Sequence, residues 1–127
     1  MRFVFRQFAF IGEESSWAAE ATECANEQSR FWDYYDKLFE EQAGENVGAF
    51  SQENLKRFAA DLELDTEKFN QCLDSGQYRE KVRQETIQGQ QEGVRGTPTL
   101  FVNGRLIENG ADYRALRTAV EAALNQP

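Results

Sequence analysis

The chain has 127 residues, enough for one domain with a substantial core, and 13% of them are aromatic, which argues against disorder. Its 14 basic and 22 acidic residues give a net charge of −8, which argues against a nucleic-acid partner because such partners are bound through Lys and Arg. The sequence contains no His, and this removes Ser-His-Asp and Cys-His catalysis and most zinc chemistry. No apolar run reaches the length of a membrane span, and the N-terminus does not have the pattern of a signal peptide.

Residues 3–10 predict a strand covered on both faces, because they are mostly apolar and show little strict alternation. Arg6 and Gln7 are expected where this strand nears its exposed end. Helices are expected next, over about residues 16–28 and 31–41, and we interpret the aromatic residues of the second helix as core packing rather than as a ligand or peptide groove. The inward face of the first helix comprises Trp17, Ala21, Cys24 and Ala25, and the buried stripe of the second comprises Phe31, Tyr34, Tyr35, Leu38 and Phe39.

Capping residues mark two shorter helices in the middle of the chain. Ser51 is placed to cap the first of them, and Asp65 to cap a second one that ends at residues 74–76. A polar helix is expected over about residues 77–92, with Gly93 directly after its end. The inward side chains are Leu55, Phe58, Ala59 and Leu62 in the first helix and Phe69, Cys72 and Leu73 in the second, while the third is polar apart from Tyr78, Val82, Thr86 and Ile87.

The C-terminal part of the chain predicts a β-hairpin followed by a helix. Pro98 precedes an apolar run and fits the first position of a strand, so residues 99–102 and 105–107 are the expected strands around a type I′ turn at Asn103 and Gly104. The inward face of the terminal helix comprises Leu116, Ala119, Val120, Ala123 and Leu124. A first strand, a last hairpin and helices between them favour an α/β layer with an inserted helical cap.

The segment 94–104, with its Gly96-Thr97-Pro98 sequence, resembles the cis-proline segment of DsbA-like thiol-disulfide oxidoreductases, which have a thioredoxin fold with an inserted helical domain. Segments 3–10, 18–25, 31–39 and 72–76 follow in the order that the family has. The resemblance implies one DsbA-like domain over 1–127, with 1–12 and 93–127 as the thioredoxin-like part and 13–92 as the inserted helical part and connecting helix. It also implies that the family's first strand and Cys-x-x-Cys motif precede residue 1, so we expect an N-terminally truncated fold.

The two cysteines, Cys24 and Cys72, are 48 positions apart, and neither is expected at the start of a helix. Their neighbours on the helix face are apolar, and burial makes thiols inert, so we expect no catalytic role for them. Two alternatives stay open, a structural disulfide or a pair of buried free thiols. The even count favours the disulfide, because the resembled family is associated with oxidising compartments, although the compartment of this chain is not predicted.

The resemblance assigns substrate binding to the loop of Gly96, Thr97 and Pro98. Thr97 would align a polypeptide through its main chain, next to a cis bond at Pro98. We expect no metal and no cofactor, because carboxylate pairs such as Glu13 with Glu14 and Glu40 with Glu41 are typical of solvated faces and helix starts.

Three functions remain open from the sequence. The first is the major part of a DsbA-like oxidoreductase that is inactive alone and acts on polypeptides or on a partner thiol protein. The second is a non-enzymatic thioredoxin-fold module for binding or assembly, and a weaker third is a relative of kappa glutathione transferases and isomerases. Loss of a central strand would expose a hydrophobic strand edge, so we also expect a homo-oligomer that associates through residues 1–10.

Overall fold

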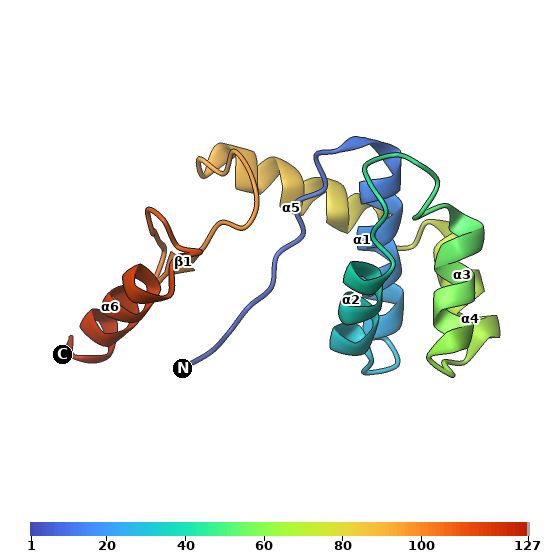
Figure 1. Ribbon diagram of the computed structural model, residues 1–127, viewed down its shortest axis with the longest axis horizontal. Helices are drawn as coiled ribbons and strands as arrows, with labels where there is room; N and C mark the ends of the chain where they lie inside the picture. Colours follow the sequence, from blue (N-terminus) through green and yellow to red (C-terminus); the bar gives the residue numbers. More distant parts are fainter. Residues whose placement is uncertain (127) are drawn as a thin grey trace. The chain divides into compact units, whose positions relative to one another are not determined.

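The computed structural model describes residues 1–126, which fold as two units, Met1–Gly89 and Gln90–Pro127. We call them the helical unit and the hairpin unit and describe each by itself (Figure 1). The assignment of residues 1–12 and 93–127 to a common part stays a prediction. In chain order the elements are α1 (Gly12–Asn26), α2 (Phe31–Glu40), α3 (Gln52–Asp61), α4 (Thr66–Ser75), α5 (Arg79–Gln91), β1 (Phe101–Val102), β2 (Arg105–Leu106) and α6 (Tyr113–Leu124).

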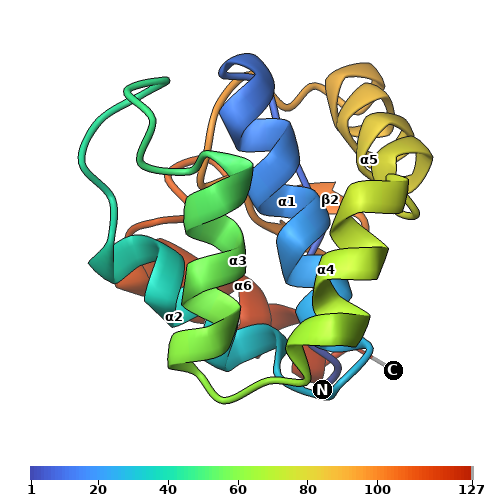
Figure 2. The ribbon, with the colours of Figure 1, turned by 90° about the vertical axis from the view of Figure 1, so that its right-hand side faces the viewer.

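The first helix, α1, is at the centre of the helical unit, where it contacts α2, α3 and α4 (Figure 2). The core between these helices contains the predicted inward residues of α3 and α4. The Tyr34 ring is completely buried, 5.4 Å from the ring of Phe69, and its hydroxyl donates to the Leu55 carbonyl at 2.9 Å. Polar and aromatic contacts together thus fix α2 against α3 and α4.

The predicted helix caps are confirmed. The Ser51 side chain accepts a hydrogen bond from the Asn54 N–H at 3.2 Å, and the Asp65 carboxylate accepts one from the Lys68 N–H at 3.2 Å. Gly76 follows α4 with a φ of +65°, the left-handed conformation that commonly ends helices. These local signals therefore set the ends of α3 and α4 where the sequence predicts them.

The strand predicted over residues 3–10 is wrong, because residues 1–10 form no strand and run as an extended trace (Figure 1). The main-chain N–H groups of Gln7 and Ala9 donate instead to side chains of α5, to Glu85 Oε2 at 3.1 Å and to Thr86 Oγ1 at 3.0 Å. A strand needs a neighbouring strand to complete its ladder, and here helix side chains provide the acceptors. We call residues 1–10 the N-terminal segment.

The aromatic stripe of α2 is only partly buried, which corrects the prediction for this helix. Tyr34 and Leu38 lie one turn apart and are buried in the core. Phe31, Tyr35 and Phe39 are also one turn apart, but Phe31 and Tyr35 are half-buried and Phe39 is 68% exposed. Successive helix residues are rotated by about 100°, so both series cannot face the same core. The second series therefore forms a separate, partly open face.

The hairpin unit contains the predicted hairpin, with β1 antiparallel to β2 and Val102 paired with Arg105. Asn103 and Gly104 have φ values of +50° and +80°, as a type I′ turn requires. Each strand has only two residues, fewer than predicted. The hairpin is therefore short, and its strand β1 contacts α6.

The inward face predicted for α6 is not fully buried within the hairpin unit. No residue of this helix is buried, and Leu124 is 66% exposed, so its assignment to the inward face is wrong. Two strands of two residues offer too little apolar surface to cover a helix of twelve residues. The half-buried side chains of this face are Leu116, Ala119, Val120 and Ala123. Among residues 1–126, no helix combines the length and the apolar character that crossing a membrane requires.

Candidate functional site

The loop before β1 contains the three residues to which the resemblance assigns substrate recognition. The Thr97–Pro98 peptide bond is cis, and both residues are exposed, whereas Gly96 is half-buried. The Thr99 hydroxyl donates to the Gly96 carbonyl at 2.6 Å and so ties the two ends of the loop together. The main-chain N–H and C=O of Thr97 form no hydrogen bond within residues 1–126. Both groups are therefore free to pair with an extended polypeptide.

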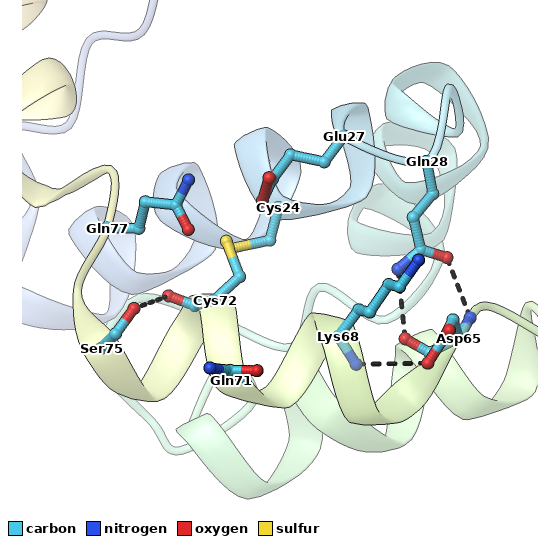
Figure 3. Close-up of a pocket in the computed structure, with 9 residues that line it drawn as sticks. All are labelled: Cys24, Glu27, Gln28, Asp65, Lys68, Gln71, Cys72, Ser75 and Gln77. Atoms are coloured by element: carbon cyan, nitrogen blue, oxygen red, sulfur yellow. Dashed lines mark hydrogen bonds between the residues drawn. A yellow bond between two sulfur atoms is a disulfide. The ribbon is translucent and has the colours of Figure 1, made fainter.

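A disulfide joins Cys24 of α1 to Cys72 of α4, with 5.9 Å between the two Cα atoms (Figure 3). The two residues are only 2% and 5% exposed. Since the chain has two cysteines and both are in this bond, it contains no free thiol. Disulfide exchange takes place at sulfur atoms that a partner can reach, and the sulfur atoms of this pair are bonded to each other inside the helical unit.

A hollow of about 580 Å³ lies beside the disulfide, lined largely by polar side chains (Figure 3). On one side the Gln28 amide donates to the Asp65 carbonyl at 3.1 Å and accepts from the Asp65 N–H at 2.8 Å. On the other side the Ser75 hydroxyl donates to the Cys72 carbonyl at 3.0 Å. The reciprocal pair ties the end of α1 to the start of α4, so it reinforces the same junction as the disulfide.

The sequence does not predict a buried polar network that joins the N-terminal segment, α1 and α5. Gln7 is 5% exposed, which corrects its expected place at an exposed strand end, and its amide donates to Thr22 Oγ1 at 2.8 Å and Glu23 Oε1 at 3.1 Å. The Lys81 amine forms ion pairs with Glu23 Oε2 at 2.9 Å and Glu85 Oε1 at 3.5 Å. Burial lowers the pKa of Lys81, but the hydrogen bonds and charges of these two carboxylates outweigh it, and the pKa is raised. A lone Gln in an apolar run gives no signal of such burial, because its partners are distant in sequence.

Glu20 of α1 is a buried carboxyl whose negative charge is only partly compensated by a cation. It is 3% exposed, and its nearest cation is the guanidinium of Arg79, with 3.9 Å between Nε and Oε1. Burial raises the pKa of Glu20, and the charge of Arg79 offsets only part of that rise. Protonation of Glu20 is thus more favourable in the folded chain than in the unfolded chain, so Glu20 contributes stability at low pH that is lost as pH rises through its raised pKa.

Replacing Glu20 with Gln is therefore expected to raise the urea midpoint of unfolding at pH 7, with the gain disappearing near pH 4. The reason is that Gln removes a buried charge that Arg79 compensates only in part. Fluorescence of Trp17 and Trp32 reports on the helical unit, which contains both residues. Glu80→Gln is the control, since that carboxyl is exposed and its pKa is lowered by its hydrogen bond to Gln84, so no gain is expected. A lower midpoint for Glu20→Gln at pH 7 would contradict the prediction.

The open face of α2 was not predicted from the sequence; on it, Asp36 and Glu40 lie beside the rings of Tyr35 and Phe39. The four-residue spacing of Phe31, Tyr35 and Phe39 is the signal that could have revealed it, because it defines a second apolar face. Within residues 1–126, no group of three or more acidic or Cys side chains is arranged to hold a metal ion.

Comparison with known families decides where the chain belongs. A family model described as thioredoxin matches residues 1–122. The chain belongs to the thioredoxin family. The crystal structure of oxidised BdbD from Bacillus subtilis is similar to this chain, with a TM-score of 0.83 and 28% sequence identity. The match covers 96% of this chain and 68% of the BdbD chain. The predicted thioredoxin-like fold class is thereby confirmed.

The named relatives support the resemblance to the DsbA-like group within the thioredoxin family. The probable disulfide bond formation protein D of Bacillus anthracis is 29% identical over 130 residues, which cover 99% of this chain and 59% of that protein. The Na(+)/H(+) antiporter NhaA of Herminiimonas arsenicoxydans is 36% identical over 106 residues, which cover 84% of this chain and 16% of the antiporter. The chain thus spans about three fifths of the first relative and a small part of the second. The resemblance to the DsbA-like family is confirmed.

Proposed function

We propose that this chain binds polypeptides for thiol-disulfide exchange but does not exchange disulfides by itself. The observation that carries the proposal is the state of its two cysteines, which are buried and joined to each other. An exchange enzyme needs a thiolate or a disulfide that its substrate can reach, and both sulfur atoms of this chain are buried in their own bond. The activity in the names of its relatives is a property of proteins that are longer than the part matched here.

The loop of Gly96, Thr97 and Pro98 is the polypeptide-binding site in this proposal. Thr97 is exposed, and its main-chain donor and acceptor have no partner in the described residues. A polypeptide in extended conformation pairs with such groups by adding a strand, and main-chain bonds make the pairing tolerant of the partner's sequence.

A binding module without any redox role is the second candidate. It is favoured by the similarity to one segment of the antiporter from Herminiimonas arsenicoxydans, because that segment makes up 16% of a protein named for ion exchange. In that case the chain would bind a polypeptide that need not contain a thiol or a disulfide.

Insulin reduction in the presence of dithiothreitol tests the first half of the proposal. We expect the chain to leave the rate at that of dithiothreitol alone, because both of its sulfur atoms are buried and out of reach of insulin, whereas a reference enzyme with a Cys-x-x-Cys motif accelerates it. The variant Cys24→Ala with Cys72→Ala should give the same background rate. A rate above background that this double variant abolishes would overturn the proposal.

Titration of the ¹⁵N-labelled chain with the reduced insulin B chain tests the second half. We expect the amide signals of Gly96, Thr97 and Thr99 to shift, while Gly104 at the hairpin turn serves as an internal reference. Thr97→Val should bind equally well, because recognition uses the main chain. Absence of shifts at the loop would remove it as the binding site, and equal binding of a B chain with alkylated cysteines would favour the second candidate.

A further inference from the structure

An exposed aromatic surface lies in the helical unit, between the N-terminal segment and α2. Phe5 connects the two parts, with its ring 5.1 Å from Phe31 and 5.6 Å from Tyr35, and the Tyr35 ring is 4.9 Å from Phe39. Phe3 and Phe39 are each 68% exposed. Single exposed apolar residues are ordinary, but a contiguous group is typical of an interaction site. The aromatic surface comprises Phe3, Phe5, Phe31, Trp32, Tyr35 and Phe39.

A shallow hollow, largely open to solvent, at one end of this surface carries negative charge. It is lined by Tyr35 and Phe39, one turn apart, and by Asp36 and Glu40, also one turn apart. Neither carboxylate forms an ion pair or hydrogen bond within residues 1–126. The one Lys of α2, Lys37, is already paired with carboxylates outside the hollow.

The chemistry of the hollow fits a Lys or Arg side chain. Aromatic faces attract cations, and two unpaired carboxylates add charge of the opposite sign to such a ligand. A long basic side chain also covers apolar surface with its methylene groups while its charged end reaches the carboxylates. Residues 1–89 hold ten basic and eighteen acidic residues, so the whole net charge of −8 lies in this unit and favours a basic partner.

The N-terminal segment offers a backbone edge beside the same surface. Its N–H groups at Gln7 and Ala9 are bonded to α5, and in an extended chain the N–H groups of alternate residues point to the opposite edge. By this alternation the N–H groups of Arg6 and Phe8 face the opposite edge, and they have no hydrogen bond within residues 1–126. An extended partner can pair with this edge in the manner of an added strand.

We propose that the aromatic surface and its acidic hollow dock an extended polypeptide segment in which a Lys or Arg side chain stands among apolar ones. The cation enters the hollow between Asp36 and Glu40, and the apolar side chains cover the exposed rings. This site uses other residues than the loop at Thr97 and recognises side chains, whereas the loop recognises main chain. A second copy of the chain could compete for the same surface through its own residues 1–10. Two copies that each carry a net charge of −8 repel each other, however, which disfavours this pairing.

Fluorescence anisotropy with labelled peptides tests the proposal. The probe is a capped ten-residue peptide of alternating Val and Thr with one central Lys, and its partner has Glu in place of that Lys. We expect the Lys peptide to bind at least tenfold more tightly than the Glu peptide. Asp36→Asn with Glu40→Gln should reduce this preference to less than threefold, and Phe39→Ala should weaken binding of both peptides.

The matched control is Glu53→Gln with Glu67→Gln, which removes the same number of charges from exposed positions on α3 and α4. It should keep the preference for Lys. Equal binding of the two peptides, or an equal loss of preference in both double variants, would show that the hollow does not select the cation. Light scattering with and without the Lys peptide shows whether a second copy of the chain occupies the surface. A dimer that persists at saturating peptide would also overturn the proposal. None of these changes touches Thr97, so failure here leaves the insulin B chain result standing.

Discussion

Replacement of both Cys24 and Cys72 by Ala is expected to lower the free energy of unfolding of the helical unit by about 4 kcal/mol. The two residues are 48 positions apart in sequence, and a cross-link of this span removes much of the conformational freedom of the unfolded chain. Ala is preferred to Ser because both positions are buried, and a buried hydroxyl without a partner adds a separate penalty. The loss is a large fraction of the total stability of a typical domain, which is about 5–15 kcal/mol.

Urea unfolding followed through the fluorescence of Trp17 and Trp32 measures this loss. Wild type with the disulfide intact is compared with the double variant, and each is measured again in excess dithiothreitol. The reductant should destabilise wild type and leave the double variant unchanged. A difference below about 1 kcal/mol between the oxidised wild type and the variant would mean that the disulfide adds little to the packing of α1 on α4.

The parts of the fold that the sequence predicts correctly depend on neighbouring residues. Ser51 and Asp65 cap helices through N–H groups three residues away, and Asn103 with Gly104 makes a turn whose backbone angles only certain residues tolerate. Gly76 ends α4 for the same kind of local reason. These features do not depend on where the rest of the chain lies.

The parts that the sequence predicts wrongly depend on distant partners. The N-terminal segment has the composition of a strand, but a strand exists only where another strand completes its hydrogen bonds, and here Glu85 and Thr86 take that place. Gln7 can be buried because its amide donates hydrogen bonds to Thr22 and Glu23. The residues around Gln7 in the sequence give no sign of these partners. Of the candidate sites, the loop at Thr97 was found through family resemblance, whereas the hollow on α2 emerged only from the structure.

Replacement of Tyr34 by Ala is expected to destabilise the helical unit by about 3–5 kcal/mol, as for other large aromatic residues in cores. Its side chain is completely buried, with its ring against Phe69, and its loss would leave a cavity among α2, α3 and α4. Tyr34→Phe keeps the ring and removes only the hydrogen bond to the Leu55 carbonyl, so it should cost about 1 kcal/mol. Burial raises the pKa of Tyr34, so the hydroxyl remains a donor across the range in which the chain would be studied.

Phe39→Ala on the same helix is the matched comparison, and it separates the two aromatic faces of α2. Phe39 is 68% exposed, so its truncation leaves no cavity, and we expect a change in the free energy of unfolding within about 0.5 kcal/mol. The same variant should weaken binding of the Lys and Glu peptides, whereas Tyr34→Phe should leave their binding unchanged. Urea unfolding and peptide anisotropy on the three variants thus distinguish a face that stabilises the helical unit from one that is free to bind. Strong destabilisation by Phe39→Ala would mean that the second face belongs to the core, and the surface would then be unavailable to a partner.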